Sequence, residues 1–167
     1  MLKGAYIFIL FLSFAASGQQ TQDIFSKQLN RLIIGVGKDL QSVQGKLKRK
    51  TTTETVFFTK VTLRETSNNE VHHLTRNTNC ASCYSFSAKI INPTVSEIAC
   101  SKVQLWKAKI ASALSSDNTP TEYKYENGDD IIDGYKFTTK GVNILIYSSK
   151  PINVETSCVY LSIIKSK

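Results

Sequence analysis

Two cysteines three residues apart, Cys80 and Cys83, have the spacing that most directly suggests chemistry in this sequence. In thiol–disulfide oxidoreductases such a pair lies at the start of a helix, where the helix dipole lowers the pKa of the first thiol. Here the residues that follow alternate as in a strand, and Tyr84 stands where covalent haem attachment requires a histidine. We therefore expect a structural disulfide, with a thiol redox or metal-binding site as the alternative.

The two remaining cysteines of the chain are Cys100 and Cys158. An even number of cysteines in an exported chain points to disulfides, and four cysteines allow three connectivities. We favour Cys80–Cys83 together with Cys100–Cys158. The second bridge would close a long loop and stabilise the fold by roughly 3–4.5 kcal/mol in the chain-entropy model.

Metal ligands could come from two places. His72 or His73 could join Cys80 and Cys83, but adjacent residues on a strand point to opposite faces, so only one histidine could do so. The aspartates within 129–133 do not have the spacing of a twelve-residue calcium loop and are typical of a hairpin turn. We expect no metal and no cofactor.

The sequence has no G-x-S-x-G, no H-E-x-x-H and no glycine-rich phosphate loop. These absences favour a non-catalytic protein.

Basic residues give the chain a formal net charge of +8, and four of them cluster at Lys46, Lys48, Arg49 and Lys50. We expect a strand there, and lysines on an edge strand block edge-to-edge aggregation. Polyanion binding through this cluster is the alternative. We do not expect a nucleic-acid partner, because no aromatic residues interleave with the cluster.

The first 18 residues have the parts of a cleavable signal peptide. Lys3 is followed by an apolar run over 5–14 and by the small residues Ala16-Ser17-Gly18, which makes Gln19 the first mature residue. The apolar run is shorter than the roughly 20 residues that span a bilayer. We predict export to the periplasm or the extracellular space, and one domain over 19–167 with no membrane span.

Apolar residues at spacings of three and four predict a first helix, with Thr21 or Asp23 at its start and Gly45 at its end. Its stripe consists of Phe25, Leu29, Leu32, Val36, Leu40 and Val43. The period then changes to two, which predicts strands over 55–64, 71–76 and 83–91, with a turn at 67–69 and Pro93 ending the block.

A second helix is predicted from Thr94, where Glu97 completes a capping box. Its buried stripe consists of Ala99, Val103, Trp106, Ile110 and Ala113. Further strands are expected over 122–126, 131–139, 142–148 and 156–165, and Asn127-Gly128 and Lys140-Gly141 supply hairpin turns. The pattern predicts an α+β fold, an antiparallel sheet with two helices packed on one face and a possible duplication of a helix-plus-strands unit.

Two resemblances accompany this pattern. The pentapeptide 41–45 is similar to the Q-x-V-x-G motif of cystatins, exported protease inhibitors that carry the motif on an exposed hairpin, whereas Val43 here continues a helix stripe. The whole layout, with its leader ending in Gly18, its helix closing at 43–45 and a later helix ending in Ala113-Leu114, resembles small exported proteins of Gram-negative bacteria. That resemblance implies a periplasmic or surface location and no known activity.

Together these features favour an exported, non-catalytic domain that binds a protein or a cell-envelope ligand. The expected binding surface is the sheet face without helices, or the loops. Phe58 is a candidate residue of this surface, because it lies opposite Phe57, Val61 and Leu63 on its strand.

Overall fold

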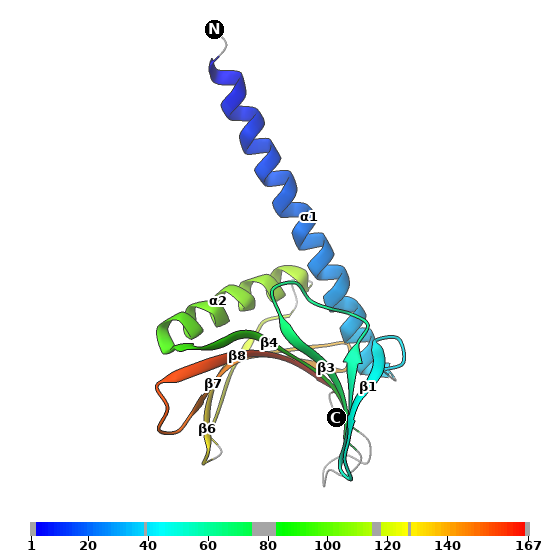
Figure 1. Ribbon diagram of the computed structural model, residues 1–167. Helices are drawn as coiled ribbons and strands as arrows, with labels where there is room; N and C mark the ends of the chain where they lie inside the picture. The colour runs from blue at the N-terminus through cyan, green and yellow to red at the C-terminus, as the bar shows by residue number, and fades with distance from the viewer. Residues whose placement is uncertain (1–2, 39, 75–82, 115–117, 127, 166–167) are drawn as a thin grey trace.

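The computed structural model describes residues 3–38, 40–74, 83–114, 118–126 and 128–165, with side chains described from residue 21 on except that of Cys83. Over these residues it is an α+β protein with two helices and one eight-stranded antiparallel sheet (Figure 1). The helices are α1 (Lys3–Lys38) and α2 (Ser96–Ala113). The strands are β1 (Gln44–Lys50), β2 (Glu54–Thr59), β3 (Ser67–Leu74), β4 (Cys83–Val95), β5 (Thr121–Glu126), β6 (Asp130–Thr139), β7 (Val142–Pro151) and β8 (Thr156–Lys165).

Neighbouring strands of the sheet follow the order β1-β2-β3-β4-β8-β7-β6-β5. Each half of the chain forms a meander of four strands, and the two meanders meet where β4 pairs with β8. The predicted terminal strand has the bounds observed for β8. The turn predicted at Lys140-Gly141 is confirmed, because Thr139 pairs with Val142 and both turn residues have positive φ, as a two-residue hairpin requires. The β5–β6 connection is longer, since Glu126 pairs with Ile131; Gly128 has positive φ there, and Asn127 lies outside the described residues.

The first helix ends at Lys38, so its predicted end at Gly45 is wrong. Leu40 takes a left-handed φ of 63° and its backbone N–H bonds to the carbonyl of Gly35, so the chain turns back there. Leu40 and Val43 remain fully buried, which is why they continued the apolar stripe. Val43 packs onto Gly35, where a Cβ would lie 2.7 Å from its Cγ1. A buried Val43 also differs from the exposed hairpin position of the cystatin motif.

The strands of the first half also depart from their predicted bounds. β2 ends at Thr59, although Val61 and Leu63 remain buried beyond it. β3 begins at Ser67, where a turn was expected. Pro93 does not end the strand block, because register shifts between β4 and β8 on either side of Ile91 accommodate an irregular backbone there.

The second helix begins at Ser96 with Val95 as its N-cap and makes no side-chain cap hydrogen bond, so the predicted capping box is wrong. Its buried residues Ala99, Val103, Trp106 and Ile110 belong to the predicted stripe, and Ala113, the last residue of that stripe, is half-buried against the core. Trp106 is fully buried and meets Phe25 of α1 edge to face, with ring centroids 5.6 Å apart.

Both helices contact β4, β7 and β8, and buried residues from both belong to one core cluster. Figure 1 shows the sheet as an arch, with α2 lying along β4 and β8 and the N-terminal half of α1 extending away from the sheet. Within the described residues, no helix is long and apolar enough to cross a membrane.

Candidate functional site

The candidate site is the second face of the sheet, which we define as the strand side chains that alternate with those of the core cluster. In β8, Val159, Leu161 and Ile163 belong to the core cluster. Because side chains alternate along a strand, Tyr160 and Ser162 point to the opposite side. The same alternation holds in β7, so the second face continues across the central strands.

A row of aromatic residues crosses this face from β5 to β8. Tyr123 pairs with Gly134, Gly134 with Tyr147, and Tyr147 with Tyr160. The ring centroids of Tyr123 and Tyr147 are 6.5 Å apart, and those of Tyr147 and Tyr160 are 5.8 Å apart and stacked. Lys89 of β4 completes the row, with its Nζ 5.6 Å from the Tyr160 ring centroid. We call these five residues the tyrosine row.

Burial changes the proton affinity of the phenols in the tyrosine row. It raises the pKa of Tyr160 to about 12, with the Cys158 thiol nearby contributing in the same direction. It also raises the pKa of Tyr147, against the smaller effect of the Ser162 hydroxyl, which lies 3.4 Å away. Both phenols therefore stay protonated and available as hydrogen-bond donors well above neutral pH.

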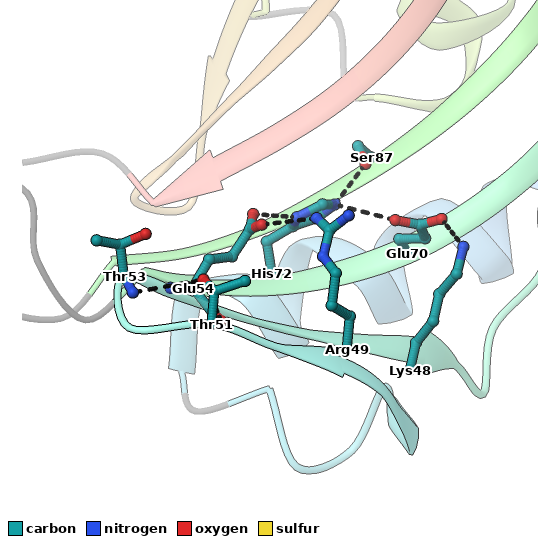
Figure 2. Close-up of polar contacts among 8 residues, drawn as sticks. All are labelled: Lys48, Arg49, Thr51, Thr53, Glu54, Glu70, His72 and Ser87. Atoms are coloured by element: carbon teal, nitrogen blue, oxygen red, sulfur yellow. Dashed lines mark hydrogen bonds and ion pairs between the residues drawn. The ribbon is translucent and has the colours of Figure 1, made fainter.

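Polar side chains from β1 to β4 form a second group on this face, centred on His72 (Figure 2). His72 Nδ1 lies 2.7 Å from Glu54 Oε1, and His72 Nε2 lies 2.8 Å from Ser87 Oγ. A further carboxylate oxygen, Glu70 Oε2, is 3.8 Å from Nε2. We call Glu54, Glu70, His72 and Ser87 the His72 cluster. Strand register brings these residues together. His72 lies directly opposite Val56 of β2 and Ser85 of β4, so Glu54 and Ser87 are its diagonal neighbours on the same face.

Two cations of the edge strand hold the carboxylates of the His72 cluster. Arg49 Nη2 lies 2.9 Å from Glu54 Oε2, and Lys48 Nζ contacts Glu70 Oε1. The hydrogen bond from His72 and the Arg49 guanidinium hold the pKa of Glu54 below its ordinary value, against the opposing effect of burial. Thr51 fixes the hairpin before β2, because its hydroxyl accepts the Glu54 backbone N–H at 3.0 Å.

Beside the His72 cluster lies a hollow of about 170 Å³. Its walls include Leu74 and Ile164, and Ser87 and Ser162 line it from opposite positions of β4 and β8. Ser162 is nearly buried, with 9% of its surface exposed. The hollow thus lies between the His72 cluster and the tyrosine row.

The predicted basic cluster lies on β1, an edge strand of the sheet, as expected. The structure pairs two of its four cations, Lys48 and Arg49, with glutamates. Among the described residues, Lys46 and Lys50 form no ion pair. This pairing reduces the local positive charge and weakens the case for polyanion binding. Phe58 lies on the second face as predicted, 51% exposed, with Lys48 Nζ 5.6 Å from its ring centroid.

The predicted disulfide between Cys100 and Cys158 is absent, because both are free thiols. The physical reason is the alternation of β8. Ser157 and Val159 are buried on the core side, so Cys158 points to the second face, whereas Cys100 lies on α2. Cys100 is exposed at a groove of about 290 Å³ that α2 forms with β5, β6 and β7. The predicted Cys80–Cys83 bridge lies outside the described residues.

The histidines lie on opposite faces, as predicted. His72 is on the second face, and His73 lies beside Tyr84 on the core side, with ring centroids 4.6 Å apart and the rings tilted by 34°. No group of three or more His, Cys, Asp or Glu residues suited to a metal ion occurs within the part of the chain that the structure describes.

Sequence reasoning did not find the His72 cluster, because Glu54, His72 and Ser87 are 18 and 15 residues apart along the chain and meet only through strand register. Nor did it find the tyrosine row as a unit. Comparison with protein-family models, with curated proteins and with solved structures finds no match to this chain, so the second face itself is the guide to function.

Proposed function

We propose that this protein is an exported domain that binds a protein or a cell-envelope ligand on the second face of its sheet. The observation that carries the proposal is the tyrosine row, which brings three tyrosines, a glycine and a lysine into one line across five strands. Aromatic rings with a polar end supply large contact area together with a hydrogen-bond donor, which is why tyrosine is enriched at binding surfaces.

The arrangement of the helices supports this choice of face. Both helices contact β4, β7 and β8 and share one core cluster, so we infer that they cover the same face of the sheet. The second face is then the side of these strands that is turned away from both helices. The repeated order of one helix and four strands, with the last strand of each set at the centre of the sheet, supports a duplicated unit.

Export rests on the leader-like first 18 residues. One feature of α1 supports cleavage after Gly18, because its N-terminal half extends away from the sheet in Figure 1. An intact mass of the protein recovered from its compartment, with a first residue at Gln19, is the expected result; a chain that still begins at Met1 would contradict it.

Site-specific photo-crosslinking tests the binding face. A photoreactive phenylalanine analogue replaces Phe58 on the second face in one variant and Leu105 on α2 in a control variant. The two positions are matched in exposure, at 51% and 56%. We expect a discrete crosslinked species in cells from position 58 only. Crosslinks of equal strength from both positions, or from 105 alone, would contradict the assignment of the binding face.

A further inference from the structure

The His72 cluster has the geometry of a nucleophile, a base and an orienting acid. Glu54 Oε1 lies 2.7 Å from His72 Nδ1, and Ser87 Oγ lies 2.8 Å from His72 Nε2. These are the distances at which a carboxylate fixes the tautomer of an imidazole and the imidazole accepts a hydroxyl proton. The three residues come from β2, β3 and β4, so paired strands hold them in place.

The surrounding charges favour Ser87 as the partner of Nε2. Glu70 Oε2 also lies near this nitrogen, but at 3.8 Å it is beyond hydrogen-bond distance. The other carboxylate oxygen of Glu70 is bound by Lys48. Arg49 holds the second oxygen of Glu54, which leaves Oε1 directed at Nδ1. Each carboxylate therefore has its own cation, and the imidazole bridges Glu54 and Ser87.

The hollow beside Ser87 offers room for a reacting group and a donor opposite the nucleophile. Ser162 pairs directly with Ser87 across β4 and β8, and side chains at such positions lie about 4.5–5.5 Å apart at Cβ. The Tyr147 hydroxyl lies 3.4 Å from Ser162 Oγ, and its raised pKa keeps it a donor. A carbonyl placed between the two serines would have its carbon near Ser87 Oγ and its oxygen near the Ser162 hydroxyl.

We propose that Ser87 is the nucleophile of an esterase site on the second face, with His72 as the base, Glu54 as the residue that orients it and Ser162 as the donor to the developing oxyanion. The substrate class is an ester with a short acyl group, because the hollow holds about 170 Å³ and Leu74 and Ile164 form its apolar walls. This activity departs from the non-catalytic domain expected from the sequence and does not rest on the binding function proposed above.

The reaction proceeds in two balanced steps. Ser87 Oγ bonds to the carbonyl carbon while its proton passes to His72 Nε2, and collapse of the tetrahedral intermediate breaks the ester bond and returns that proton to the leaving alcohol. Water then attacks the acyl-Ser87 ester, gives a proton to His72, and the collapse releases the carboxylic acid and restores the Ser87 hydroxyl. No redox step or added co-reactant is needed.

The test is covalent labelling of the intact chain with a fluorophosphonate probe, followed by tandem mass spectrometry and by hydrolysis of p-nitrophenyl acetate. We expect the probe on Ser87, and we expect Ser87→Ala to abolish labelling. Changing His72→Asn should slow labelling by about 100-fold or more, since general-base catalysis contributes about that much. Ser101→Ala, a change at an exposed serine of α2, is the matched control and should label as the wild type does.

The two glutamates near His72 separate catalysis from a simple charge network. Glu54→Gln should slow labelling by about tenfold or more, and Glu70→Gln should leave the rate within about threefold, because only Glu54 bonds to the ring. Thermal melts identify variants that do not fold, and the site of labelling in the folded wild type tests the proposal without any variant. No labelling of the folded wild type, labelling at another residue, or equal dependence on Glu54 and Glu70 would overturn the proposal.

Discussion

Gly134 is the position at which the structure most clearly forbids a side chain. It lies in the tyrosine row between Tyr123 and Tyr147, and a Cβ built on it would be 2.1 Å from the Ile146 carbonyl oxygen and 2.6 Å from Tyr147 Cα. Both contacted atoms belong to the backbone of β7, so no change of rotamer can relieve the contact. Gly134→Ala must therefore separate β6 from β7 or displace Tyr147.

The magnitude follows from two opposing effects. Overpacking of this kind costs about 1–3 kcal/mol, whereas replacing a strand glycine with alanine recovers roughly 0.5–1 kcal/mol of backbone entropy. Because the clash is with backbone, we expect a net loss of about 1–2 kcal/mol. A domain of this size loses roughly 2–4 °C of melting temperature per kcal/mol, so the midpoint should fall by about 2–8 °C.

Thermal and urea melts, followed by circular dichroism, measure the effect, with Gly37→Ala as the control. A Cβ at Gly37 would lie 3.5 Å from the Lys140 carbonyl oxygen and from Val142 Cγ1, which are ordinary contacts, and the residue is helical. That variant should be neutral or up to about 1 kcal/mol more stable. An unchanged midpoint for Gly134→Ala, or equal losses for both variants, would refute the assigned register of β6 and β7.

Three further predictions concern the core, the His72 cluster and the cysteines. Trp106→Ala should destabilise the protein by about 3–5 kcal/mol in urea melts, and Trp106→Phe by clearly less, because the indole N–H has no hydrogen-bond partner among the described residues. Contacts in the folded state lower the pKa of Glu54 from its ordinary value of 4.5, so the ionised carboxylate stabilises the fold above pH 4.5. This stabilisation is lost as the pH falls through the lowered pKa of the folded state. In urea melts above and below this range, Glu54→Gln should therefore lose less stability on acidification than the wild type. Native alkylation should modify Cys100 before Cys158, and peptide maps without reductant should show no Cys100–Cys158 link.

Local patterns predicted the parts of the fold that local interactions determine. The strand over 156–165 followed from alternation, and the hairpin turn at Lys140-Gly141 followed from a glycine at a position of positive φ. The buried stripe of α2 followed from helical spacing. Each of these features depends on residues of a single helix, strand or turn, so a short stretch of sequence is enough to predict it.

The errors arose where a burial pattern continued after the backbone changed. Leu40 and Val43 are as buried as the helical residues before them, yet the helix has ended at Lys38. Val61 and Leu63 likewise keep the alternation of β2 after the strand has ended. The spacing of apolar residues shows which side chains pack against the core, but it does not show whether their backbone is regular. A loop that packs against the core can continue the same spacing.

The candidate site could not be predicted in this way, because it depends on strand register between distant segments. A one-residue shift of β8 would exchange its faces, placing Tyr160 and Ser162 in the core and exposing Val159, Leu161 and Ile163. All three of those residues are fully buried, at 0% exposure. Exposing them to water would cost about 1.5–3 kcal/mol for each side chain, so the shift is unfavourable. The core thus fixes the register that aligns the tyrosine row and sets Ser162 opposite Ser87. It also sets Cys158 on the face away from Cys100, so the same alternation that builds the proposed site excludes the disulfide that cysteine counting favoured.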